Sequence, residues 1–422
     1  MTEKDLKNNP RILICTVNAW NSIIGDNTFP TLLKDYDKDK IANLFIREEK
    51  PDSDVCDMYF RISEDRVLKS IFKRTIKTGE IVNLTDDQNN TAEFEKHLKR
   101  YNNKSRFYYP KLFLREIVWK VGKWKSSELD NFLDEFKPDV VLYEMSRYIH
   151  LNNIVMYILK RTKAKGVGCF WDDTFTYKQE RGCLFKVLRF FQRRNLKRLA
   201  SKTRDFFAIT PKTKREADEF FKINTVLLTK PILTNRPFDP PIKKENISIL
   251  YTGNLGVGRL KTVILLAKAI KDECWLRLDI YTNSYLSKKE VFELKSCNVF
   301  LHSAVPQTEV FKLQSNADVL LFAESFDDRN MIARLSFSTK ITDYYSAGRC
   351  ILALGNAGLA SMELFKENDS AIIVNNAKQI SRAIALLSDY ETRIYYSKQA
   401  YMAGLNNHSI SEIKKRFYSI LF

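Results

Sequence analysis

Short apolar runs alternate with amphipathic stretches along most of the chain, a pattern typical of α/β proteins with parallel sheets. In the first half this pattern predicts strands at Ile12–Val17, Ile41–Arg47, Val140–Tyr143, Val167–Phe170, Phe206–Thr210 and Val226–Leu228. In the second half it predicts strands at Ile247–Tyr251, Leu278–Tyr281, Ala317–Ala323 and Cys350–Leu354. Helical stretches such as Leu151–Leu159 and Leu260–Ile270 lie between them. The fold class is therefore α/β, with two separate sheets.

A proline-rich segment separates the two sets of strands. Residues 236–246 include Pro237, Pro240 and Pro241 among charged neighbours, which indicates an interdomain linker. The chain has 422 residues, more than one hydrophobic core usually holds. We therefore expect an N-terminal domain over 1–235, a C-terminal domain over 247–402 and a terminal helix over 403–422.

The segment from Ala317 to Leu354 carries the first candidate chemistry. A strand is followed by a polar loop, and a helix then opens at Ser338 as N-cap and ends at Gly348. Free N–H groups and the helix dipole in the first turn would attract a phosphate, and Lys340 would add a positive charge there. Asp343, one turn later, could accept hydrogen bonds from a ribose. An ordinary capped helix with a solvated Lys340 explains the same pattern equally well.

A glycine-rich loop gives a second candidate for phosphate binding. The strand ending at Tyr251 runs into Thr252-Gly-Asn-Leu-Gly-Val-Gly-Arg259, and a helix follows. Glycines let the backbone approach a phosphate closely, and Arg259 could bind two of its oxygens. A glycine pattern alone is weak evidence, but the strand–loop–helix context strengthens it. We therefore favour phosphate binding over a solvated Arg259.

These two segments resemble the nucleotide-sugar site of GT-B glycosyltransferases, in particular glycosyltransferase family four. Ser338, Thr339 and Lys340 match the opening of the family's helix, and Asp343 matches its second acidic residue. The family's first glutamate would fall on Leu335, so the chain departs from the pattern there. Glu324 is the acid directly after the strand and is our replacement for it, with Asp327 and Asp328 as competitors.

The resemblance implies two Rossmann-like domains facing across a cleft, with a C-terminal helix that crosses back to the first domain. It implies sugar transfer from a nucleotide-sugar to a glycan or polyprenyl-linked acceptor, with retention at the anomeric carbon. We expect no metal or cofactor, because Arg259, Lys340 and the helix N-terminus can neutralise the leaving diphosphate. The segment Val299–Phe311 resembles the one that frames the nucleotide base. The donor-binding residues would be Gly253, Asn254, Gly256, Arg259, His302, Val305, Ser338, Thr339, Lys340 and Asp343.

The acceptor would bind on the N-terminal domain. The loop after the first strand faces the cleft in GT-B enzymes, which points to Asn18, Gly25 and Asp26, although a plain connecting loop is an equal alternative. Asp172 and Asp173 follow another strand and could orient an acceptor hydroxyl, but a helix cap is slightly favoured. With that alternative open, we assign catalytic roles to Arg259, Lys340, Glu324 and Asp172.

Composition narrows the class of partner. The net charge is +18, yet the sequence has no zinc-finger spacing or RNA-binding signature, so nucleic acid is the weaker interpretation. Seven scattered cysteines favour reduced thiols, and the sequence shows no signal peptide or membrane span, so we expect a cytoplasmic protein. Asp52-Ser-Asp54 matches a metal-binding pattern of GT-A glycosyltransferases, but it does not directly end a strand, and we interpret it as a solvated loop.

The segment from Leu184 to Arg204 has eight basic residues and no acidic one. Leu184, Val187, Leu188, Phe191 and Leu199 fall on one helical face, with Lys186, Arg189, Arg193 and Lys197 elsewhere. This pattern favours an amphipathic helix on an anionic membrane surface, which would make the protein peripheral on the inner face of the cytoplasmic membrane. A helix packed on its own domain with a solvated face is the alternative.

Two other functions remain open at this stage. A nucleotide-sugar epimerase on the same fold would need acid and base groups around the sugar ring and no acceptor surface. A catalytically inactive basic protein that binds membrane or nucleic acid is the second alternative. For the transferase, surface polysaccharide synthesis, such as capsule or lipopolysaccharide, is the expected setting.

Overall fold

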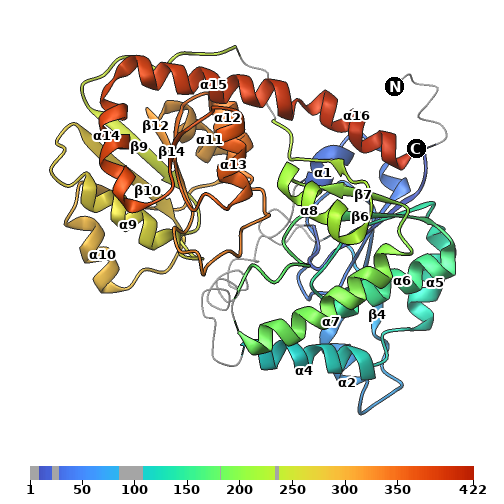
Figure 1. The fold of residues 1–422 in the computed structure, drawn as a ribbon. Helices are drawn as coiled ribbons and strands as arrows, with labels where there is room; N and C mark the ends of the chain where they lie inside the picture. Colours follow the sequence, from blue (N-terminus) through green and yellow to red (C-terminus); the bar gives the residue numbers. More distant parts are fainter. Residues whose placement is uncertain (1–8, 21–27, 85–107, 181, 233–236) are drawn as a thin grey trace.

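The computed structural model describes residues 9–20, 28–84, 108–180, 182–232 and 237–422. They form two α/β domains, one with an eight-stranded sheet and one with a six-stranded sheet (Figure 1). Residues 237–246, in the segment expected to be a linker, form neither helix nor strand.

The first sheet has the strand order β4-β3-β2-β1-β5-β6-β7-β8, and every neighbouring pair is parallel except β3 with β4. Its central strands are buried on both faces, which explains why they read as continuous apolar runs in the sequence. The strands are β1 (Ile12–Cys15), β2 (Ile41–Phe45), β3 (Met58–Ile62), β4 (Gly79–Ile81), β5 (Val140–Glu144), β6 (Lys165–Phe170), β7 (Asp205–Ala208) and β8 (Val226–Leu227).

Helices cover both faces of this sheet, and local capping fixes where several of them begin. The Ser126 side chain accepts a hydrogen bond from the Leu129 amide, and Thr210 caps the next helix with Pro211 in its first turn. The helices are α1 (Thr28–Leu33), η2 (Lys38–Lys40), α2 (Glu64–Lys69), α4 (Tyr108–Val121), α5 (Ser127–Phe136), α6 (Ile149–Thr162), α7 (Cys183–Ala200) and α8 (Pro211–Phe221).

The second sheet is entirely parallel, with the order β11-β10-β9-β12-β13-β14. In chain order this is 3-2-1-4-5-6, the arrangement of a Rossmann domain, whose ligands bind where the strand order reverses. The reversal lies between β9 and β12. The strands are β9 (Ile247–Thr252), β10 (Leu276–Thr282), β11 (Val299–Ser303), β12 (Val319–Ala323), β13 (Cys350–Leu354) and β14 (Ile372–Val374).

Two helices of the second domain have well-defined terminal signals. Ser287 and Glu290 form a capping box at one N-terminus, and Gly348 ends another helix in the left-handed conformation, with φ of 61°, as expected from the sequence. The helices are α9 (Arg259–Ala269), α10 (Lys288–Lys295), α11 (Gln307–Asn316), α12 (Lys340–Ala347), α13 (Ala360–Glu367), η3 (Ala377–Gln379) and α14 (Ile380–Ser388).

Two terminal helices join the domains. Helix α15 (Tyr390–His408) packs on the second domain, and α16 (Ile410–Leu421) runs on to the first (Figure 1). Ile413, Phe417 and Leu421 of α16 are buried in one apolar cluster with β1 and β7 residues. The ring centroids of Phe417 and Phe207 lie 5.8 Å apart. The expected crossing of the C-terminal helix back to the first domain is therefore confirmed.

The predicted apolar face of the basic helix is wrong. In α7, Leu188 and Leu199 point inward and are buried, whereas Leu184, Val187 and Phe191 point outward and are exposed. Arg189, expected away from the apolar face, is also buried, and its Nη2 donates to Gln179 Oε1 at 2.7 Å. An amphipathic pattern does not tell which apolar residues meet the protein core when apolar residues occur on both sides of a helix.

Candidate active site

Two loops at the strand reversal of the second sheet bring most candidate donor residues together. One runs from Gly253 to Gly258, between β9 and α9, and the other starts at Glu324, directly after β12. Helix α12 begins beyond the second loop, at Lys340. The carboxyl ends of parallel strands on either side of such a reversal form a crevice in open α/β sheets. The glycine loop and Lys340, which are separate in the sequence, meet at this edge.

Gly253 gives Lys340 the space it occupies. Gly253 has φ of 121°, and a Cβ atom placed on it would lie 2.8 Å from Lys340 Cε and 2.9 Å from Nζ. Any other residue would therefore be strained in its backbone and would push the lysine away. The Lys340 ammonium lies over the Tyr251 ring, 4.1 Å from its centroid, which adds a cation–π contact.

The rest of the glycine loop is held by side-chain contacts. Asn254 Oδ1 accepts from the Gly256 amide at 2.5 Å, and Asn330 donates to the Val257 carbonyl at 2.7 Å. Val257 has φ of 57°, a conformation that is costly for a β-branched residue. Such strain persists only where the surroundings impose it, and it is common at ligand-binding loops.

Arg259 and Glu324 form a charged pair across the strand reversal. Arg259 Nη2 lies 2.7 Å from Glu324 Oε1, and the glutamate side chain is 6% exposed. Asp327 instead pairs with Arg329, and Asp328 accepts from Asn356 at 2.5 Å. Among the three acids considered from the sequence, Glu324 is therefore the one that these contacts place beside Arg259.

The charge of Lys340 is sensitive to its surroundings. Burial and, to a lesser extent, repulsion from Arg259 together lower the pKa of Lys340 to about 7, against attraction from Glu324 and Asp343. A bound diphosphate would supply the missing counter-charge. Three cations, Arg259, Lys340 and Lys230, thus lie around two carboxylates, Glu324 and Asp343, an arrangement that favours an anionic ligand.

The expected N-cap of α12 is corrected by one residue. The helix begins at Lys340 and Thr339 precedes it in a helical conformation, without a side-chain capping bond. Ser338 contributes through its backbone, since its carbonyl accepts from the Ile341 amide at 3.0 Å. A short helical turn before Lys340 therefore replaces the serine cap predicted from the sequence, and Lys340 still occupies the first turn.

Asp343 contacts the other domain. Lys230, which follows β8, donates to Asp343 Oδ1 at 2.8 Å, and the two side chains are 12% and 22% exposed. The carboxylate expected to bind ribose is thus also one half of an interdomain ion pair. Ribose hydroxyls would have to share it with Lys230 or use its second oxygen.

His302 lies at the carboxyl end of β11, where it stacks on Tyr281 of β10. The ring centroids are 4.3 Å apart with an interplanar angle of 14°, and His302 Nε2 lies 3.0 Å from Asp279 Oδ1. Val305 follows in the loop before α11 and is half-buried. The stacked pair gives this edge of the sheet a flat aromatic surface of the kind that a base can cover.

On the first domain, Asp172 and Asp173 differ in environment, and both face the loop from Glu324 to Thr339. Asp172 accepts a hydrogen bond from Ser336 and lies 3.8 Å from Arg147, with its side chain 40% exposed. Asp173 is fully buried and accepts from Arg334. The helix-cap interpretation is wrong, because the next helix, α7, begins only at Cys183.

The other residues expected to bind the acceptor show no arrangement that supports this role. Asn18 is half-buried, and its carbonyl accepts from Thr16 Oγ1 at 2.7 Å. Gly25 and Asp26 lie outside the described residues. Asp173, for its part, is occupied by Arg334 and Thr176 and does not face a free acceptor space.

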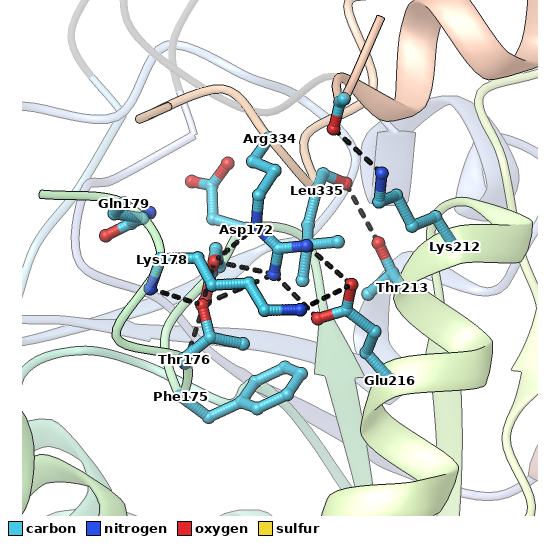
Figure 2. A network of polar contacts seen from close by, with 12 residues as sticks. Asp172, Phe175, Thr176, Lys178, Gln179, Lys212, Thr213, Glu216, Arg334 and Leu335 are labelled. Atoms are coloured by element: carbon cyan, nitrogen blue, oxygen red, sulfur yellow. Dashed lines mark hydrogen bonds and ion pairs between the residues drawn. The ribbon is translucent and has the colours of Figure 1, made fainter. Parts of the chain in front are cut away.

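A buried polar network across the two domains was not anticipated from the sequence. Figure 2 shows Arg334 pointing toward Glu216 of α8, with Nη2 donating to Glu216 Oε2 at 2.7 Å. In the same view Thr213 donates to the Leu335 carbonyl at 2.8 Å. Lys212 of the same helix donates to the Gly358 carbonyl at 2.8 Å. The loop that carries Glu324 is therefore anchored on the first domain.

No local signal in the sequence marks this network, because its partners lie more than a hundred positions apart. Within the described ranges, no three His, Cys, Asp or Glu side chains gather in a group suited to a metal ion. In the same residues, no helix is long and apolar enough to span a bilayer.

Comparison with known proteins places the fold. No family model matches the sequence, and no curated protein sequence matches it. A solved α,α-trehalose 6-phosphate synthase from Burkholderia multivorans is similar in structure, with a TM-score of 0.58 and 9% identity over 98% of this chain and 96% of that chain. A point mutant of TarM from S. aureus, solved with fondaparinux, α-GlcNAc-glycerol and UDP, gives 0.59 and 10% identity over 98% and 99%. The chain therefore has the GT-B fold, and at this identity the likeness concerns the fold alone.

Proposed function

We propose that the protein is a glycosyltransferase that moves a sugar from a nucleotide-sugar to a glycan or polyprenyl-linked acceptor. The observation that carries this proposal is the position of the Lys340 side chain in the space left by the missing Cβ of Gly253, beside the Arg259–Glu324 pair at the strand reversal of the second sheet. In this proposal residues 247–402 bind the donor and residues 1–235 the acceptor. The linker over 236–246 and the helix over 403–422 hold the two domains opposite each other.

The chemistry follows from where charge develops. As the bond from the sugar to the diphosphate breaks, negative charge builds on the leaving phosphate, and positioned cations lower the barrier most at that point. Lys340 and Arg259 would stabilise this negative charge, together with amides of the glycine loop. Glu324 would hold the Arg259 guanidinium in place through their 2.7 Å contact. These groups make a metal ion unnecessary in our proposal, and retention follows from the family resemblance.

Other residues would position the donor and the acceptor. The Tyr281–His302 stack offers a flat surface to the base, Val305 offers backbone groups to its edge, and Asp343 would accept from the ribose. Asp172, partly exposed after β6, would orient the acceptor hydroxyl. The TarM structure contains UDP, which makes UDP the first nucleotide to test. Synthesis of a surface polysaccharide at the cytoplasmic membrane is the setting we propose.

A thermal-shift series with UDP, GDP, ADP and their sugar conjugates tests donor binding. A rise in melting temperature with one nucleotide, lost in Lys340→Ala, is expected. Transfer is then measured by release of that nucleoside diphosphate with added glycan or polyprenyl-linked acceptors. Conversion of the donor to an epimer without acceptor would replace the transferase by an epimerase. Strong inhibition by a chelator would contradict metal independence and return attention to Asp52 and Asp54.

A further inference from the structure

Helix α4 turns a row of large apolar side chains to the outside. Leu114, Ile117 and Val121 recur at intervals of three and four residues and are 61%, 55% and 46% exposed. The opposite face of the helix carries Trp119, which is buried against His150 of α6. The exposure is therefore a property of one face of the helix and does not come from loose packing.

Helix α7 packs beside α4 and has the same arrangement (Figure 1). Leu184, Val187, Phe190 and Phe191 are exposed at the start of its outer face, with 55% exposure for Phe190. Arg194 and Arg198 continue that face one and two turns later. Tyr109 of α4 meets Phe185 of α7 at 6.1 Å between ring centroids, which fixes the two helices side by side.

A third element adjoins these helices on the other side of α4. Helix α2 contacts α4, and Phe72, in the turn that follows α2, is 88% exposed. Lys73 and Arg74 lie next to it and are exposed as well. Single exposed apolar residues are normal on proteins, but a cluster over neighbouring helices marks a contact surface. We call these outer faces of α4 and α7, with the turn after α2, the apolar-basic surface.

The charges on the apolar-basic surface have one sign. Lys111, Lys120 and Lys186 flank the apolar rows and are exposed, and the sequence of α7 contains no acidic residue. The acid of α4, Glu116, turns inward, where its oxygens accept from the amides of Ile149 and His150. Glu64 of α2 is paired with Arg115. These flanking cations would add nothing to the binding of a neutral apolar partner, whereas they would attract an anionic one.

We propose that the apolar-basic surface docks the protein on an anionic lipid bilayer, with the apolar side chains entering the headgroup region and the cations pairing with lipid phosphates. An apolar row bordered by lysine and arginine is the physical requirement for a helix lying in a membrane interface. Binding should need both parts, since burial of apolar area and attraction to anionic lipid add together. The proposal extends beyond sugar transfer and does not depend on it.

Co-sedimentation with vesicles tests the proposal in the full-length protein without donor or acceptor. Wild type should bind vesicles of equal parts phosphatidylcholine and phosphatidylglycerol at low ionic strength, and bind pure phosphatidylcholine far less. Arg194→Gln with Arg198→Gln should weaken binding roughly 30-fold, because each cation near an anionic surface contributes about 1 kcal/mol. Leu114→Gln with Ile117→Gln should abolish the binding that persists at raised salt.

A matched control comes from the second domain. Phe292 is 77% exposed on α10, and Lys289 is exposed on the same helix, so Phe292→Gln with Lys289→Gln removes the same chemistry elsewhere. This control should bind vesicles as wild type does. The proposal is overturned if wild type ignores anionic vesicles, or if control and surface variants lose binding equally. Concentration-dependent association in light scattering, lost in the surface variants and without vesicle binding, would assign the surface to a protein contact instead.

Discussion

Arg334 and Asp173 form a buried ion pair between the two domains, with Nη2 and Oδ2 3.0 Å apart and the side chains 4% and 0% exposed. Arg334 belongs to the loop that begins with Glu324, and Asp173 follows β6 of the first domain. Glu216 of α8 completes the site by accepting from both terminal nitrogens of Arg334. The pair therefore ties the loop of the candidate donor site to the first domain.

Replacing Arg334 by glutamine should destabilise the protein by about 3 to 5 kcal/mol, because it leaves two carboxylates without their cation in a buried site. Denaturant unfolding monitored by fluorescence measures this. Arg329→Gln is the matched control, because Arg329 pairs with Asp327 on the surface of the same loop, where its side chain is 74% exposed. It should leave stability nearly unchanged, because an exposed ion pair is screened by solvent. Equal losses of stability in the two variants would show that the buried network stabilises the protein no more than the surface pair does.

The same network predicts a pH dependence of stability. Although burial opposes it, hydrogen bonds and attraction from Arg334 lower the pKa of Glu216. The unfolded glutamate titrates near its ordinary value of about 4.3. Its contribution is therefore complete above about pH 4.3 and is lost as pH falls through the lower folded pKa. As pH falls through this range, the free energy of unfolding should decrease more steeply for wild type than for Glu216→Gln. Parallel pH curves for the two proteins would show that Glu216 does not contribute to the pH dependence.

Most of the strands could be predicted from the sequence because parallel strands buried on both faces leave continuous apolar runs, but β3, β4, β11 and β14 were not predicted as strands. The Rossmann-like arrangement came from the family resemblance and not from these runs. Gly348 was accessible for a similar reason, since a left-handed helix end requires a glycine-like residue. Lys340, Arg259 and Gly253 could be named because each lies beside a strand or helix end that the local pattern defines.

Arg334 and the orientation of α7 could not be read from the sequence. Arg334 finds Asp173 161 residues away, and nothing near either residue signals the partner. In α7 both faces carry apolar residues, so the helical pattern allowed either face to pack against the domain. In the structure, the face that contains Arg189 is buried. These features depend on tertiary contacts, which a single sequence does not contain.

Lys340→Ala should reduce turnover of the donor about a hundredfold, the usual cost of losing one positioned charge at a developing anion. Arg259→Ala should behave similarly, and the double variant should lose less than the sum, because both cations act on one leaving group. Initial rates of nucleotide release provide the measurement. Lys268→Ala, on the exposed side of α9, is the control and should retain full rate. Activity of Lys340→Ala within a few-fold of wild type would exclude Lys340 as a diphosphate ligand.

Binding of a nucleoside diphosphate should depend on pH through Lys340. Its pKa is lowered to about 7 in the free protein, chiefly by burial, and a diphosphate would raise it again. Binding should therefore be strongest below pH 7 and weaken as pH rises above 7, with uptake of a proton from the buffer. Calorimetry in two buffers of different ionisation enthalpy measures that uptake directly. An affinity that is flat from pH 6 to 9 would mean that the lysine does not titrate at the site.

Asp343→Asn separates two roles of one carboxylate, because Asp343 both pairs with Lys230 and is our candidate ribose acceptor. A ribose contact exists in the ground state and the transition state alike, so its loss should raise the KM for the donor more than it lowers kcat. Lys230→Met removes the interdomain pair but leaves the carboxylate free for ribose. If ribose binding dominates, Lys230→Met should leave the donor KM unchanged or lower it, since the lysine no longer competes. If both substitutions raise KM equally and the double variant adds nothing, the residues act only as a pair that holds the domains, and the ribose assignment fails.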